Sequence, residues 1–176
     1  LLLEFKHTKA FSLPGGFVFK EESTDEAATR ILWERTGVKD IYLEQFHTFG
    51  EQNRGNWDVH KTTMSTHGFE LQADHWLLQR FISIGYYALV DFSKVQPTPD
   101  IFSDLGNWHD IHQIPALILD HNLIIDKALE TLRLMLDHKL VGFNLLSETF
   151  TMNELQSLYE TILDKKLLRA NFQRKM

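Results

Sequence analysis

The sequence predicts an α/β domain over residues 1–140, followed by a small helical domain over residues 141–176. Three observations lead to this prediction. Short runs of β-branched and aromatic residues are typical of strands, and other segments repeat apolar residues at the spacing of an amphipathic helix. A capping pattern at Thr151 then opens a new helix soon after Val141-Gly142-Phe143, which we interpret as the domain boundary.

The strands are expected at residues 1–5, 41–46 and 81–90. Each is apolar and rich in residues that favour extended backbone. Residues 51–80, in contrast, are polar, carry three histidines and show no clear period. We therefore expect a loop there, which can contain short strands.

The α/β domain is expected to contain two helices. Ser23 and Glu26 have capping-box spacing and Gly37 follows the last helical residue, so the first helix is predicted over residues 25–36. The second, over residues 124–136, has an amphipathic pattern.

The C-terminal domain is predicted to hold two further helices. Thr151 and Glu154 repeat the capping-box spacing, and a turn through Asp164 leads to the last helix, residues 168–176. Its residues Leu168, Phe172 and Met176 recur every four positions, so we expect all three to face a small core while the other side stays polar and basic.

Charge is unevenly distributed along the chain. The net charge is −6, but residues 164–176 hold five basic residues and one acid, a local +4 that leaves −10 for residues 1–163. Such a basic end is typical of a solvated charged segment or of a nucleic-acid contact. The absence of cysteine excludes disulfides and cysteine-ligated metals. No apolar run reaches the roughly 18 to 20 residues of a membrane span and no signal peptide is recognisable, so we predict a cytoplasmic protein that contacts no membrane.

Seven residues between positions 16 and 38 follow a fixed pattern: a glycine, five residues, a glutamate, seven residues, then an arginine-led cluster. They are Gly16, Glu22, Arg30, Leu32, Glu34, Gly37 and Val38. This segment resembles the Nudix box. The resemblance implies an α/β/α sandwich with a mixed sheet, in which helix glutamates hold divalent cations against a diphosphate.

Two mismatches in the box remove this chemistry. The first metal-binding glutamate is replaced by Ile31 and the last by Arg35, and neither residue type binds magnesium. We therefore predict no catalytic residue, no metal site and no cofactor, and a pocket retained for binding. Arg35 is expected either to pair with a neighbouring carboxylate or to meet a phosphate in place of the metal.

The effector-binding residues that we predict are Phe17, Glu34, Arg35 and Arg54. The resemblance places Arg54 on the loop that approaches the ligand, where an arginine suits a diphosphate. An exposed loop charge is the alternative for this residue. His109 and His112 are interpreted as surface histidines rather than a metal pair, and Asp120 as a local cap for the helix that follows it.

The segment that includes Thr151, Glu154-Leu155-Gln156 and Asn171-Phe172 resembles a winged helix-turn-helix. It is similar to the DNA-binding domain of the Nudix-related transcriptional regulators, a family that controls NAD synthesis or sugar catabolism in bacteria. The wing that would follow Met176 and a first N-terminal strand are not in the sequence, so we expect this domain to be incomplete.

This second resemblance implies a homodimer that binds double-stranded operator DNA and senses ADP-ribose, another nucleotide sugar or a sugar metabolite. The alternative is a Nudix hydrolase of nucleoside diphosphate derivatives with an unusual metal site. The residues predicted to contact DNA are Lys166, Arg169, Asn171, Gln173, Arg174 and Lys175.

Overall fold

The computed structural model describes residues 1–5, 8–41, 43–54, 65, 75, 79–100, 103–136, 138 and 145–176. In these residues the strands are β1 (Leu2–Phe5), β2 (Phe11–Ser12), β3 (Leu43–Phe49), β4 (Ser83–Ala88) and β5 (Ser103–Asn107). The α-helices of the same part of the chain are α1 (Thr24–Thr36), α3 (His121–Met135), α4 (Met152–Leu163) and α5 (Arg169–Lys175). It also contains the short 3-10 turns η2 (Phe92–Lys94) and η3 (Ile111–Gln113).

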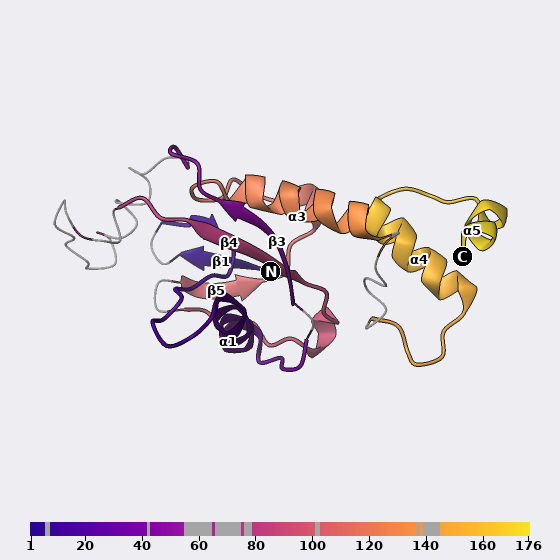
Figure 1. The fold of residues 1–176 in the computed structure, drawn as a ribbon, viewed down its shortest axis with the longest axis horizontal. Coiled ribbons are helices and arrows are strands. Elements are labelled where there is room, and N and C mark those ends of the chain that lie inside the picture. Colours follow the sequence, from indigo (N-terminus) through magenta and orange to yellow (C-terminus); the bar gives the residue numbers. More distant parts are fainter. Residues whose placement is uncertain are drawn as a thin grey trace.

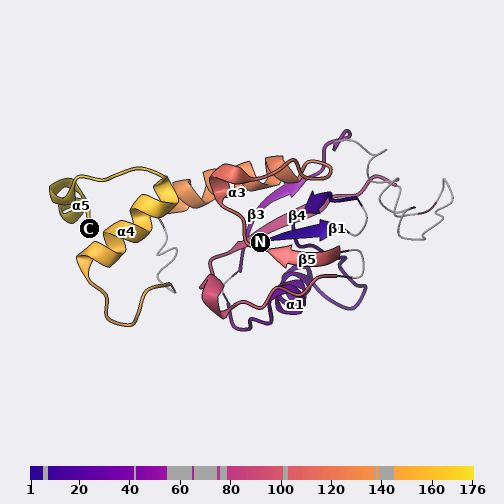
Figure 2. The ribbon, with the colours of Figure 1, turned by 180° about the vertical axis from the view of Figure 1, so that it is seen from behind.

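The strands lie between α1 on one side and α3 on the other (Figure 1). This arrangement is the three-layer sandwich that the sequence predicts. The apolar core between the layers contains Leu2, Leu3, Phe5, Ala27, Phe49, Val95, Ile118 and Leu132. The view from behind shows the same order of layers, with α4 and α5 beyond the far end of α3 (Figure 2). In the part of the chain described here, no helix is long and apolar enough to cross a membrane.

The strands form two groups. In the first, β1 is central and pairs antiparallel with β2 and with β5, and in the second β3 pairs antiparallel with β4. An isolated parallel bridge joins Phe11 to Leu117, just before α3. The strand pairs described here are therefore antiparallel, and the parallel pairing is limited to this isolated bridge.

The strand bounds differ from the sequence prediction. β3 covers Leu43–Phe49 rather than residues 41–46, since its pairing with β4 continues past a register shift between Gln45 and His47. β5 has the sequence SDLGN, whose glycine, aspartate and asparagine disfavour strands, and it forms by pairing along β1. The loop predicted over residues 51–80 lies mostly outside the described residues.

Candidate functional site

The helix of the Nudix box, α1, is fixed at both ends by its own sequence. At its start, Ser23 accepts from the backbone N–H of Glu26 at 3.2 Å, and the Glu26 carboxylate accepts from the N–H of Ser23 at 2.7 Å. At its end, Gly37 adopts the left-handed conformation, with φ 69°, and donates to the carbonyl of Trp33 at 2.8 Å. The predicted capping box and glycine stop are therefore confirmed.

Arg30 connects the box loop to this helix. Its guanidinium donates to both oxygens of Glu22 at 2.6 and 3.0 Å, to Glu34 at 3.2 Å and to the carbonyl of Phe17 at 2.8 Å. It also stacks over the ring of Phe19, 4.2 Å from its centroid. The hydrogen bonds from Arg30, with one from the Phe19 N–H, lower the pKa of Glu22. The two box carboxylates that match the family are thus held by an internal cation.

The positions that would complete a metal site carry an apolar and a cationic side chain. Ile31 is half-buried, and a Cβ built on Gly16 would lie 2.8 Å from its Cδ1 and Cγ1 atoms. Arg35 places its Nη2 3.9 Å from Glu34, which is the neighbouring carboxylate that the sequence led us to expect, and its Nε is buried without a hydrogen-bond partner. Among the described residues, no three histidine or acidic side chains are grouped to hold a metal ion.

Three of the four predicted effector residues lie around α1. Phe17 and Glu34 are joined through Arg30, and Arg35 follows Glu34 on the helix. Phe17 is 49% exposed, and its contact with Arg30 is made by its backbone carbonyl.

Arg54 lies elsewhere and is buried, so the alternative of an exposed loop charge is wrong. It is 2% exposed and makes two 2.8 Å hydrogen bonds to the Asp120 carboxylate. Its Nη1 donates to the Ser83 hydroxyl at 2.8 Å and to the Phe81 carbonyl at 3.3 Å.

The start of α3 receives contacts from two loops. Asp120 occupies the N-cap position but makes no side-chain cap, since its carboxylate binds Arg54; the predicted local cap is therefore wrong. His121, the first residue of the helix, accepts a hydrogen bond at Nδ1 from the backbone N–H of Leu13, 3.0 Å away. Leu13, which lies just before the Nudix box, and Arg54 therefore both contact the start of α3.

The other end of α3 belongs to a second core. Leu136, Leu155, Tyr159 and Phe172 are all buried together, and the Tyr159 hydroxyl donates to the Leu136 carbonyl at 3.1 Å. The rings of Tyr159 and Phe172 meet edge to face at 5.2 Å. Through this core, α4 and α5 pack against the C-terminal end of α3.

The turn between α4 and α5 is organised by Glu160. Its carboxylate accepts from the Lys166 ammonium at 2.8 Å, from the Leu167 N–H at 3.0 Å and from the Gln156 amide at 2.9 Å. These three hydrogen bonds, that from Lys166 first, lower the pKa of Glu160 from 4.5 to about 2. We did not single out this residue from the sequence, although Gln156 lies four residues before it on the same helix and Lys166 and Leu167 follow in the next turn.

The last helix is shorter than predicted and rests on one anchor. Phe172 is buried, but Leu168 is 74% and Met176 46% exposed, so the expectation that all three face the core is wrong. The helix has seven residues, and Leu168 and Met176 are its N-cap and C-cap. Only Phe172 of the three therefore lies within the helix, where the four-residue spacing applies. The six residues predicted to contact DNA are all exposed: Lys166, Arg169, Asn171, Gln173, Arg174 and Lys175.

Two further contacts join α4 to the α/β domain. His112 lies 3.4 Å from Asp164, the C-cap of α4, and Arg133 of α3 donates through Nε to the Ile162 carbonyl at 2.9 Å. His109 instead packs its ring against Phe11, with the centroids 5.5 Å apart. The two histidines therefore have separate partners, Phe11 for His109 and Asp164 for His112.

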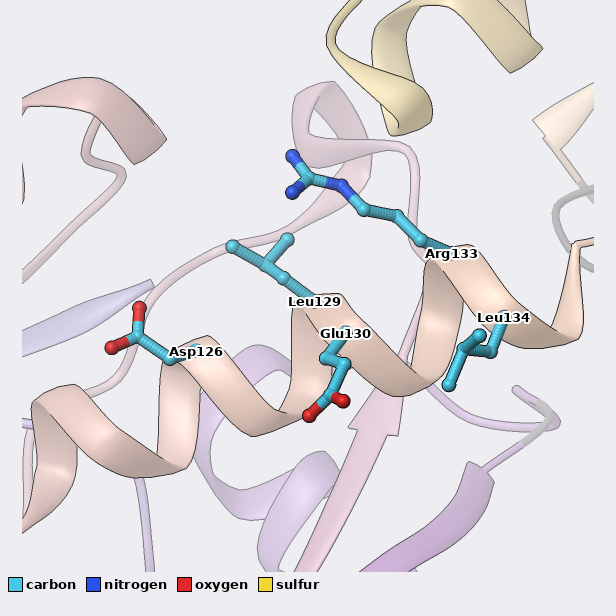
Figure 3. A pocket seen from close by; sticks show the side chains of 5 residues that line it. All are labelled: Asp126, Leu129, Glu130, Arg133 and Leu134. Atoms are coloured by element: carbon cyan, nitrogen blue, oxygen red, sulfur yellow. The ribbon is translucent and has the colours of Figure 1, made fainter.

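A hollow of about 460 Å³ lies along one face of α3 (Figure 3). Its lining residues are Asp126, Leu129, Glu130, Arg133 and Leu134. They share no member with the Nudix box, and all come from one helix, so we do not assign the hollow to the effector.

The layers, the box helix and the two C-terminal helices define a Nudix-fold domain joined to a helix-turn-helix unit. Residues 1–132 match the NUDIX domain model, and residues 142–176 match the model of the NrtR DNA-binding winged helix domain. The chain belongs to the Nudix family. The predicted combination of the two domains is confirmed, whereas the boundary between residues 140 and 141 lies outside the described residues and stays a prediction.

The chain is similar to a bacterial repressor and to two proteins of known structure. The chain is 28% identical over 172 residues to the ADPR responsive transcriptional repressor NtrR of Acinetobacter baylyi, an alignment that covers 94% of this chain and 59% of that protein. The chain thus spans less than two thirds of that relative. Shewanella oneidensis NrtR complexed with a 27mer DNA is 28% identical, with a TM-score of 0.68 over 99% of this chain and 73% of that one. A MutT/nudix family protein from Enterococcus faecalis, 21% identical, supports the fold alone, with a TM-score of 0.71 over 99% and 71% of the chains.

Proposed function

We propose that the chain is a DNA-binding transcriptional regulator whose Nudix domain senses a small effector. The observation that carries this proposal is the exposed surface of α5, where arginine, lysine, asparagine and glutamine surround the single buried anchor Phe172. In a helix-turn-helix the second helix enters the major groove. There arginine, asparagine and glutamine read base edges and lysine mostly meets phosphate.

The proposed effector is ADP-ribose, another nucleotide sugar or a sugar metabolite. The name of the Acinetobacter relative includes response to ADPR, and Glu34 and Arg35 place charged groups 3.9 Å apart on α1. We assign Arg54 to holding the start of α3, because its donors are occupied by Asp120 and Ser83.

The proposed partners are double-stranded operator DNA and a second copy of the chain. One short reading helix covers only a half-site, and a two-fold dimer matches a palindromic operator. We place this regulator in the cytoplasm, where its DNA would be.

The test is fluorescence anisotropy of the chain with duplex DNA from upstream of its own gene, with and without ADP-ribose. Arg174→Ala should weaken binding, whereas Lys94→Ala, which removes an equal charge from a 79% exposed side chain on η2, should not. If the parent binds no DNA at about 50 mM salt, where phosphate contacts are strongest, the proposal fails.

We also infer that the chain does not hydrolyse nucleoside diphosphate derivatives. Ile31 and Arg35 stand where the family's reaction needs carboxylates, and Glu34 is engaged by Arg30. Turnover of ADP-ribose with magnesium or manganese should stay far below about 1 per second, the low end of ordinary enzyme rates. Turnover at or above that rate would favour the hydrolase.

A further inference from the structure

The Nudix fold implies a divalent cation at the box helix, and the residues of this chain do not fit one. Magnesium requires near-octahedral oxygen ligands and usually keeps several of its waters. At the first ligand position, Ile31 supplies no oxygen and packs so closely on Gly16 that even an added Cβ there would be 2.8 Å from it. The space beside this position is therefore filled by an apolar side chain.

The remaining box carboxylate is not free to bind a cation either. Glu34 accepts a hydrogen bond from Arg30 at 3.2 Å and lies 3.9 Å from the guanidinium of Arg35. A divalent cation would have to compete with both arginines for the Glu34 carboxylate. Their repulsion opposes binding of the metal at this point.

Arg35 itself brings a positive charge to the position of the last metal-binding glutamate. Its side chain is 17% exposed, and its Nε is buried with no hydrogen-bond partner. Buried donors in proteins are nearly always paired, so an unpaired one indicates an unfilled interaction. Because the guanidinium presents its donors as a planar fork, the acceptor that fits best is the pair of oxygens on a phosphate.

We propose that Arg35 takes the place of the family's divalent cation, so that the diphosphate of the effector binds this chain without metal. This inference rests on the proposed sensing function and names the chemical group that the site recognises. The site binds the diphosphate by charge-assisted hydrogen bonds, and the positions that would activate water on a metal are filled by Ile31 and Arg35.

The experiment is isothermal titration calorimetry of the chain with ADP-ribose and, separately, with inorganic pyrophosphate, each in excess EDTA and in excess magnesium. Both probes are expected to bind in EDTA with the affinity that they show in magnesium. Arg35→Ala should weaken both by roughly 10- to 100-fold, the loss expected for a hydrogen bond to a charged group. Arg35→Lys, which keeps the charge but not the fork, should fall between the parent and Arg35→Ala.

Two controls keep the result interpretable. Lys94→Ala removes one exposed cation from another part of the domain and should bind both probes as the parent does. Thermal melting of every variant checks that the domain is folded, and if Arg35→Ala melts early the Lys variant carries the comparison.

The inference is overturned if binding disappears in EDTA, if Arg35→Ala and Arg35→Lys bind as the parent does, or if neither probe binds the parent in EDTA. Failure of the proposed function has a different signature. The chain would then fail to bind DNA, or would bind it with no response to ADP-ribose, while calorimetry still recorded metal-independent binding of the diphosphate.

Discussion

The ion pair between Arg54 and Asp120 joins segments 66 residues apart, and its removal should destabilise the Nudix domain strongly. The two side chains are 2% and 12% exposed and share two hydrogen bonds of 2.8 Å. In Asp120→Ala the guanidinium keeps only the Ser83 hydroxyl and the Phe81 carbonyl as partners. A buried charge is then left without its counter-ion.

The expected cost follows from that burial. Removal of one partner from a buried pair typically costs about 3–5 kcal/mol, since the surviving charge stays desolvated and unpaired. For a chain of this size the loss corresponds to a fall in melting temperature of roughly 6–20 °C. The double variant Arg54→Met with Asp120→Leu removes both charges, so we expect it to recover most of the loss.

Urea unfolding followed by tryptophan fluorescence measures this effect. All four tryptophans precede residue 140, so the signal reports on the Nudix domain. The matched control is Lys127→Ala, which breaks an exposed pair with Glu130 of the same 2.8 Å length and should cost at most about 0.5 kcal/mol. The reasoning is refuted if Asp120→Ala costs no more than this control, or if the double variant is less stable than the single one.

Three further outcomes are expected. Asn171→Ala should lower DNA affinity by about 1–3 kcal/mol and relax sequence preference, whereas Lys175→Ala should weaken all duplexes alike and reduce the salt slope by about one unit in an anisotropy titration. Because the pKa of Glu160 is lowered from 4.5 to about 2, its stabilisation is fully present above pH 4.5 and is lost as the pH falls toward 2. The melting temperatures of the parent and Glu160→Gln, recorded by circular dichroism, should therefore converge over that range; a constant gap would contradict the assignment. Sedimentation at micromolar concentration should give the mass of a dimer, and a monomer would count against the two-fold arrangement.

The features that could be predicted from the sequence are those encoded by near neighbours. Both capping boxes join residues three positions apart, and each helix begins within two residues of its cap. The Nudix box is likewise a local pattern, and the mismatches at Ile31 and Arg35 could be identified without a structure. Where the geometry is set within one turn of helix, residue types determine it almost completely.

The features that could not be predicted depend on distant partners. β5 has a sequence that disfavours strands, and it forms because its backbone pairs with β1 across about 100 residues of chain. Leu168 matches the apolar period of the last helix, yet it lies at the N-cap of a helix that is only seven residues long, and its side chain stays exposed. Local propensity and period were outweighed here by tertiary pairing and by the length of the element.

The ion pair of Arg54 fixes one end of α3, whose other end packs against the C-terminal helices. Its partner Asp120 and the Leu13 contact at His121 fix the first turn of α3, while Leu136, at the other end, is packed under Tyr159 of α4. A helix moves as a rigid body, so we expect a shift of the start of α3 to displace Leu136 and the helices that pack on it as well. An effector that displaced Leu13 would break its hydrogen bond to His121 in the first turn of α3. Sequence reasoning placed Arg54 at the ligand, but the structure pairs it with Asp120 at the start of α3.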